Sequence, residues 1–100
     1  DTTGIVVKGS WVSDWSENKD LTRVEGTNTF KITMDWAAGI ELYFMVYDNG
    51  ADTGLGMNAT AVTDDASKAL LEEAYNIKVK DAGTYTFTVD ADTMTITVTK

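Results

Sequence analysis

The sequence predicts an all-β fold, an immunoglobulin-like antiparallel β-sandwich with one short helix at about residues 64–75. Sixteen of the 100 residues are threonine, and many alternate with apolar residues. Successive side chains of a strand point to opposite faces, so this alternation gives each strand one apolar and one polar face. About six or seven such segments, with turns every ~8–12 residues, are typical of a sandwich.

The domain organisation follows from length and composition. A chain of 100 residues with 43% hydrophobic content is long enough for one core and too short for two, which predicts a single domain at 1–100. Because the chain starts at Asp1 rather than Met, we expect it to be excised from a larger protein.

The strands of the first half are short and end at turn residues. Ile5–Lys8 is followed by Gly9, and Thr29–Trp36 alternates strictly. Ile40–Tyr47 is apolar almost throughout, which predicts a central strand with both faces covered. The composition of residues 48–54 predicts a loop. The predicted inward face of the second strand comprises Phe30, Ile32, Met34 and Trp36.

The second half predicts a helix, a short strand and a hairpin. Residues 64–75 lack Gly and β-branched residues and are rich in Ala, Leu and Glu, with Thr63 or Asp64 as the N-cap. Its expected buried stripe is Ala66, Ala69, Leu70 and Ala74. Residues 76–80 form a strand, and residues 84–90 and 94–99 form a hairpin with apolar and Thr residues in strict alternation.

Composition excludes several function classes. The chain has no Cys and no His, so it has no thiol nucleophile, no disulfide, no zinc–thiolate site and no Ser-His-Asp triad. Its net charge of −8 opposes binding to nucleic acid or to anionic membranes. The acidic pairs Asp64–Asp65 and Glu72–Glu73 are typical of solvated surfaces, and so small a sandwich rarely encloses a glycosidase cleft. We therefore expect no enzyme and no cofactor.

For two acidic segments, a calcium-binding site is an alternative to a simple polar turn. Residues 48–54 are rich in Asp, Asn and Gly, but they miss the spacing of a calcium-binding helix–loop–helix, and Asp90 and Asp92 are a second pair. A polar turn is the simpler interpretation of both, so no metal site is predicted.

Trp15 is the most informative aromatic residue. It lies in a polar stretch, residues 10–20, that has no strand period. A Trp ring exposed there would stack on a sugar, while nearby amides and hydroxyls bind the sugar hydroxyls. The alternative is that Trp15 folds back to cover the end of the sandwich.

The order of several motifs resembles starch- and glycogen-binding modules. Gly9-Ser10-Trp11-Val12-Ser13-Asp14-Trp15-Ser16, Leu21-Thr22-Arg23 and a Tyr/Phe-rich strand ending at Asp48 are similar to the glycogen-binding domain of the AMP-activated kinase beta subunit and to isoamylase-type modules. Asn76-Ile77-Lys78-Val79, Ala82-Gly83-Thr84-Tyr85-Thr86 and the Thr-rich ending resemble the starch-binding domains of the Sus outer-membrane lipoproteins and pullulanase modules.

The resemblance implies a set of sugar-binding residues. It implies that Trp15 stacks on glucose, that Asn76 binds sugar hydroxyls, and that Trp11 takes a position that is more often core. Lys78, two residues after Asn76 on the same strand, is expected to add a further hydrogen bond to the 2- and 3-hydroxyls of the glucan. The family's strand Lys is absent here, and Tyr43 or Tyr47 would replace it by stacking. Residues 64–75 have no counterpart in the family and are expected to flank the groove.

The resulting hypothesis is a non-catalytic, monomeric α-glucan-binding module of a bacterial cell-surface or secreted protein, accompanied by other modules of its parent chain. The alternative hypothesis is an immunoglobulin-like spacer or protein-interaction domain without a sugar site. An exposed Trp15 beside a second aromatic residue distinguishes the two.

Overall fold

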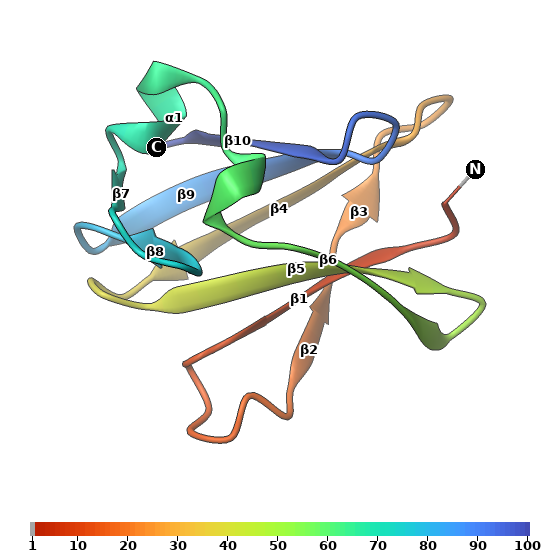
Figure 1. The fold of residues 1–100 in the computed structure, drawn as a ribbon, viewed down its shortest axis with the longest axis horizontal. Helices are drawn as coiled ribbons and strands as arrows, with labels where there is room; N and C mark the ends of the chain where they lie inside the picture. The colour runs from red at the N-terminus through yellow and green to blue at the C-terminus, as the bar shows by residue number, and fades with distance from the viewer. Residues whose placement is uncertain (1) are drawn as a thin grey trace.

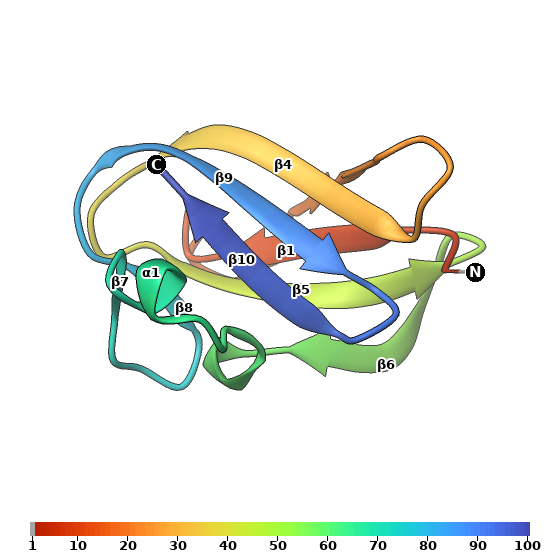
Figure 2. The same ribbon diagram turned by 90° about the horizontal axis from the view of Figure 1, so that it is seen from above.

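A computed structural model describes residues 2–100, and it forms two antiparallel sheets packed face to face (Figures 1 and 2). The six-stranded sheet has the order β2-β1-β5-β8-β7, with β6 also paired to β5, and the four-stranded sheet has the order β10-β9-β4-β3. The predicted all-β sandwich is therefore confirmed. The strands are β1 Ile5–Gly9, β2 Asn18–Asp20, β3 Thr22–Arg23, β4 Thr29–Trp36, β5 Glu41–Asp48, β6 Ala51–Met57, β7 Leu71–Glu72, β8 Ile77–Val79, β9 Gly83–Asp90 and β10 Thr95–Thr99.

The four-stranded sheet shows the alternation that the sequence predicts. The β9–β10 hairpin pairs Thr97 with Thr88, and β4 pairs with β9 along its whole length, Thr33 opposite Thr86. Apolar side chains of these strands point to the core, and the threonines point outward. The Thr33 and Thr86 hydroxyls are 2.7 Å apart, so cross-strand hydrogen bonding adds to this outer face.

Aromatic rings from both sheets meet in the core. Phe87 of β9 lies 5.4 Å from Phe44 of β5 and 6.4 Å from Trp36 of β4, measured between ring centroids. Such offset and edge contacts are favourable beyond the apolar area that they bury. The core thus joins the two sheets through residues that the alternation had assigned to inward faces.

Strand β5 is central, as predicted, because β1 borders one side and β6 and β8 border the other. Leu42, Phe44 and Val46 point into the sandwich. The opposite face is only partly covered, since Tyr43 and Tyr47 are half-buried there while Met45 between them is buried. The prediction that both faces of this strand are covered is therefore correct only at its centre.

Three strands lie where the sequence predicted none. Residues 18–20 and 22–23 form β2 and β3, although their polar sequence has no alternation. Residues 51–57 form β6, so the predicted loop at 48–54 is wrong beyond Gly50. In each case backbone pairing with a neighbouring strand, β1, β4 or β5, stabilises a strand that side-chain burial does not.

The predicted helix at 64–75 is also wrong in length. The helix α1 covers only Asp65–Lys68, and the chain then forms β7. Asp64 caps it by accepting a hydrogen bond from the Ser67 backbone N–H at 3.0 Å, as predicted. The buried residue is Ser67, not Ala66 or Ala69, because its hydroxyl accepts a bond from the Val98 N–H at 2.8 Å. Docking on β10 therefore overrides the helix propensity of the Ala- and Leu-rich sequence.

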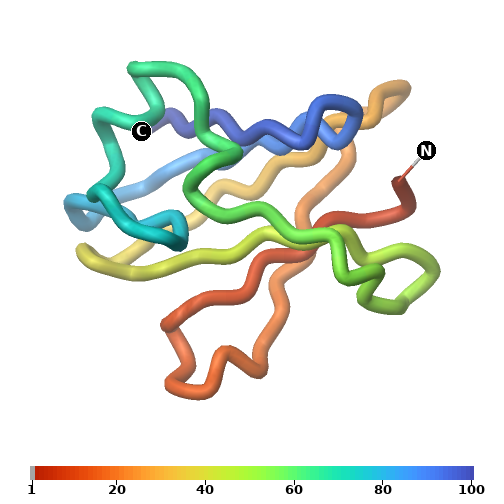
Figure 3. Tube along the Cα trace, viewed as in Figure 1, coloured from red at the N-terminus to blue at the C-terminus, as the bar shows by residue number. Residues whose placement is uncertain are grey.

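The connecting loops lie at different parts of the sandwich (Figure 3). The β1–β2 loop projects below the six-stranded sheet in Figure 1, on the side away from the four-stranded sheet. The β5–β6 turn and residues 2–4 lie together at the other end of β5, and a short 3₁₀ helix, η1 (Ala59–Ala61), follows β6. Among the helices of residues 2–100, none is long and apolar enough to cross a membrane.

Candidate functional site

Three of the predicted binding residues lie at one end of the six-stranded sheet. Glu41 of β5 pairs with Lys78 of β8, and Leu42 pairs with Ile77. Because Leu42 and Ile77 are buried in the core, alternation directs Tyr43 and Lys78 outward. Asn76 directly precedes β8 and is half-buried at the same end of the sheet. The sheet thus brings an aromatic ring and an ammonium group to one end of one face, with an amide at the same end of the sheet.

The loop that carries Trp15 is fixed to the same end of this face. Ser10 and Glu41 exchange two hydrogen bonds: the Ser10 backbone N–H donates to the Glu41 carbonyl, and the Glu41 N–H donates to the Ser10 Oγ, each at 3.0 Å. Glu41 is two residues from Tyr43 on β5. The loop, residues 10–17, therefore begins beside the strand that carries Tyr43 and projects beyond its outer face (Figure 1).

Local hydrogen bonds hold Trp15 in an unusual backbone conformation. Trp15 has a φ of 58°, in the left-handed region that bulky side chains rarely adopt. Its N–H donates to the Val12 carbonyl at 3.2 Å, and the Asp14 carboxylate accepts from the Ser16 N–H at 3.2 Å. The bonds from Ser16 hold the pKa of Asp14 below its ordinary value. Such backbone strain is often found at functional sites. The indole is half-buried, less exposed than the binding hypothesis expects, and among residues 2–100 it is paired with no other aromatic ring.

Trp11 has a different environment. Its ring lies 5.6 Å from the Trp36 ring at the edge of the core, and Lys19 Nζ lies 5.1 Å from its centroid. A Cβ atom on Gly9 would stand 2.5 Å from the Trp11 ring, so this packing requires glycine there. Trp11 thus supports the base of the loop from the inside.

Tyr43 also lines a groove that the sequence did not predict. This cavity of about 350 Å³ lies between β6, η1 and the chain before β8, and its second aromatic residue is Tyr75, whose side chain is 79% exposed. The Tyr43 hydroxyl lies directly over Gly56, where a Cβ atom would be 1.8 Å away. We call this cavity the tyrosine groove; it is lined by Tyr43, Gly56, Met57, Asn58, Thr60, Ala61, Tyr75 and Met94.

Polar groups on one wall of the tyrosine groove are already ordered. Asn58 caps η1, and its side-chain oxygen accepts bonds from the Thr60 N–H at 3.0 Å and from the Thr60 hydroxyl at 2.6 Å. Met94 on another wall has a φ of 55°. Sequence analysis missed Tyr75, Asn58 and Thr60 because it assigned Tyr75 to a helix and gave residues 58–60 no element. The one sequence signal for this groove was Tyr75, an aromatic residue directly before Asn76 of the family motif.

Tyr47 does not share this site. It lies four residues after Tyr43 on the same strand, which corresponds to about 14 Å along β5. Its ring lines a different cavity, at the end of β5 near the N-terminus. The structure therefore separates the two tyrosines that the sequence offered as alternatives for one position.

The acidic turns are occupied by internal hydrogen bonds. Asp48 accepts from the Thr3 N–H at 2.7 Å and from its hydroxyl at 2.9 Å, which lowers the pKa of that carboxyl. Asp90 accepts from the N–H groups of Asp92 and Thr93. Within residues 2–100 no group of three or more acidic residues is arranged to hold a metal ion.

The fold has a counterpart among solved structures. The chain superposes on SusF from Bacteroides thetaiotaomicron with a TM-score of 0.68 and 27% sequence identity over 99% of its length. It spans about a quarter of SusF, 24% of that chain. No family model matches the sequence, and no curated protein matches it. The Sus part of the resemblance is therefore confirmed, while the likeness to pullulanase modules and to the kinase domain stays a prediction.

Proposed function

We propose that the domain binds α-glucan, such as starch, maltooligosaccharide or glycogen, without catalysis. The observation that carries this proposal is the position of Trp15, on a hydrogen-bonded, strained loop that projects beyond the face bearing Tyr43. Stacking aromatic rings beside hydrogen-bonding groups are the chemistry that sugar recognition requires. Asn76 and Lys78 lie at the same end of the sheet as Tyr43 and would bind the sugar hydroxyls.

In this proposal the ligand runs from the Trp15 loop across Tyr43 into the tyrosine groove. Trp15 and Tyr43 supply apolar ring faces, and Tyr75 supplies a third that is already exposed to solvent. The Asn58 amide and the Thr60 hydroxyl would meet the sugar edge there. Trp11 acts indirectly, by packing the loop against the core.

The overall charge fits a neutral ligand. Two lysines flank Tyr43: Lys8 lies directly opposite it on β1, and Lys78 on β8 has its Nζ 3.7 Å from Glu72 Oε2, which partly neutralises that second cation. The net charge of −8 would repel an anionic polymer, whereas it has no such effect on a glucan. A solvated acidic surface also keeps an extracellular domain soluble.

The likeness to SusF supports a place for this domain in a larger assembly. SusF is about four times as long as the aligned segment, and the Sus lipoproteins that the sequence resembles bind starch at the outer membrane. We infer a bacterial cell-surface location, a monomeric domain and further modules in the parent chain. Weak sites of this kind gain avidity when several modules engage one polysaccharide.

Native affinity electrophoresis tests the proposal. The domain should be retarded in gels that contain amylopectin and should migrate normally in gels with xylan or soluble cellulose derivatives. Retardation should disappear in the Trp15→Ala variant. Normal migration in every gel would reject the proposal and favour a structural spacer or protein-interaction domain.

A further inference from the structure

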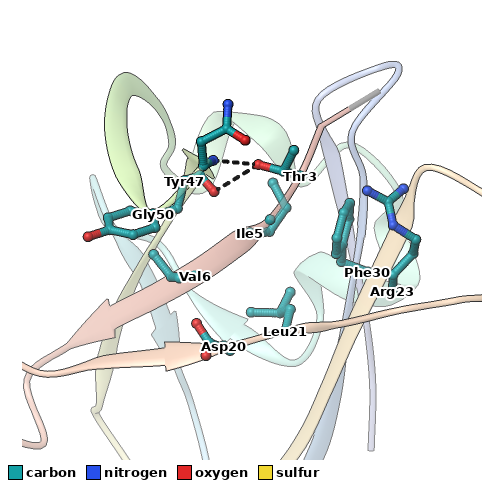
Figure 4. Close-up of a pocket in the computed structure, with 11 residues that line it drawn as sticks. Thr3, Ile5, Val6, Asp20, Leu21, Arg23, Phe30, Tyr47 and Gly50 are labelled. Atoms are coloured by element: carbon teal, nitrogen blue, oxygen red, sulfur yellow. Dashed lines mark hydrogen bonds between the residues drawn. The ribbon is translucent and has the colours of Figure 1, made fainter.

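A second cavity lies at the opposite end of β5 from the Trp15 loop. It has a volume of about 390 Å³ and opens between the end of β5, the strands β1 and β2, and the start of β3 (Figure 4). In Figure 4, Tyr47 and Arg23 stand on opposite sides of it, with Asp20 and Leu21 below. We call it the Tyr47 pocket; it is lined by Thr3, Gly4, Ile5, Val6, Asp20, Leu21, Arg23, Phe30, Tyr47, Asn49 and Gly50.

The Tyr47 pocket combines an apolar floor with free polar groups at its rim. Ile5, Leu21 and Phe30 are buried beneath it. At the rim, the Asp20 carboxylate, the Tyr47 hydroxyl and the Asn49 side-chain amide make no hydrogen bond to any other described residue. An aromatic ring, a carboxylate and an amide on an apolar base are the groups that bind a sugar ring and its hydroxyls.

The walls of the pocket are fixed by hydrogen bonds that do not use those groups. The Arg23 guanidinium lies 4.6 Å above the Phe30 ring and donates to the carbonyls of Thr2 and Thr27. The Thr3 hydroxyl accepts from the Asn49 N–H at 2.8 Å and donates to Asp48 at 2.9 Å. Because the cavity is built before any ligand arrives, binding costs little conformational entropy.

One side of the pocket, formed by Tyr47, Val6 and Asp20, lies on the same face as the proposed glucan site, whereas its floor of Ile5, Leu21 and Phe30 belongs to the core. Tyr43 and Tyr47 point to the same side of β5 and are about 14 Å apart. Between them lie Met45 and, directly opposite on β1, Val6, both buried in spite of their outward orientation. This apolar centre separates two polar, aromatic ends of one face.

We propose that the Tyr47 pocket is a second binding position for neutral sugar units, used by the same glucans as the first. This inference rests on the proposed function for its choice of ligand. Tyr47 stacks on the sugar, Asp20 accepts hydrogen bonds from its hydroxyls, and Asn49 donates to or accepts from a further hydroxyl. The Asp20 carboxylate and the net charge of −8 disfavour an anionic ligand. Two positions on one rigid face would let a single domain bind one polysaccharide bivalently.

Backbone amide chemical shifts during titration with maltotriose test the second site separately from the first. In the unmodified domain, the amides of Asp20, Asn49 and Gly50 should shift as one group and those of Tyr43 and Lys78 as another. Asp20→Ala and Tyr47→Ala should abolish the first response and leave the second unchanged, while Tyr47→Phe should keep both. Retention on amylopectin should fall by about tenfold in Tyr47→Ala as the bivalent contact is lost.

The outcomes distinguish the two proposals. Shifts confined to Tyr43 and Lys78 would overturn the second site and leave the proposed function standing. Shifts confined to the Tyr47 pocket, abolished by Asp20→Ala, would support the second site and reject the first. Absence of both responses would reject both proposals, and a response near Asn49 that survives both Asp20→Ala and Tyr47→Ala would overturn the second site.

Discussion

The outer faces of the two sheets follow the same alternation rule but have different surfaces. The four-stranded sheet presents rows of threonines from β4, β9 and β10, with Thr33 and Thr86 hydrogen-bonded across strands. The six-stranded sheet presents Tyr43, Met45 and Tyr47 along β5. The two cavities described above, the tyrosine groove and the Tyr47 pocket, involve the six-stranded sheet or the segments beside it, and neither is lined by the outward threonines of β4, β9 and β10.

The difference shows what converts a sheet face into a candidate binding face. A face of threonines is stable in water because each hydroxyl forms a hydrogen bond with water or with a neighbouring hydroxyl, so no other segment has to cover it. Tyrosines leave apolar ring surface that is only partly covered, and here loops and turns rise on each side of it: the Trp15 loop, the β5–β6 turn and η1. Aromatic residues together with flanking loops, rather than the sheet itself, make the cavities.

Removal of the Trp15 ring should have the largest effect on binding. Trp15→Ala should abolish retention on insoluble starch and change the melting temperature little, because the ring is half-buried and the loop is held by backbone bonds. Trp15→Gly should lose binding equally and be at least as stable, since glycine accepts a φ of 58°. A large fall in melting temperature for both variants would show that Trp15 is a core residue and that the site assignment is wrong.

Displacement of Tyr43 should have the next largest effect. A Cβ atom at Gly56 would collide with the Tyr43 hydroxyl, so Gly56→Ala should rotate the ring away and weaken starch binding by about tenfold, or ~1.4 kcal/mol. The fold should tolerate the change, because the clash is with the flexible end of a side chain. Leu55→Ala, on the same strand and also exposed to solvent, is the matched control and should bind normally. Equal affinity of Gly56→Ala and the control would remove Tyr43 from the site.

Changes on the threonine face should affect stability slightly and binding not at all. Thr33→Ala removes the hydroxyl pair with Thr86, and we expect a loss of about 0.5 kcal/mol in the free energy of unfolding measured with urea. Amylopectin retention should match that of the unmodified domain. Weakened retention in Thr33→Ala would show that the four-stranded sheet also contacts glucan.

The smallest expected effect is the pH dependence that Asp64 contributes. Hydrogen bonds from Ser67 lower the pKa of Asp64 below its ordinary value of 3.8. A lowered folded-state pKa stabilises the fold above the ordinary value, and this stabilisation disappears as the pH falls from there through the lowered pKa. Asp64→Asn keeps an N-cap that does not titrate. Its urea midpoint should fall less steeply than that of the unmodified domain below pH 3.8; identical profiles would mean that the cap contributes no linkage.

The accuracy of the sequence analysis varies along the chain for a physical reason. For the β9–β10 hairpin and β4, the sequence predicted both the strands and their buried and exposed faces, because the alternation of polar and apolar residues identifies which side chains are buried. β2 and β6 were missed because backbone pairing, not side-chain burial, makes them strands. The helix was predicted too long because Ser67 docks on β10 and the chain then turns to pair with β8.

The sequence by itself determined the all-β class, the inward and outward faces of the long strands, the exclusion of thiol and histidine chemistry, and Trp15 as a residue of interest. Only the tertiary structure decided which of these residues meet. It paired β8, which carries Lys78, with the start of β5 close to Tyr43, exposed Tyr75 across the tyrosine groove, and moved Tyr47 to a separate pocket. The physical reason is that alternation specifies the face of each side chain, whereas strand order and register, set by long-range pairing, specify its neighbours.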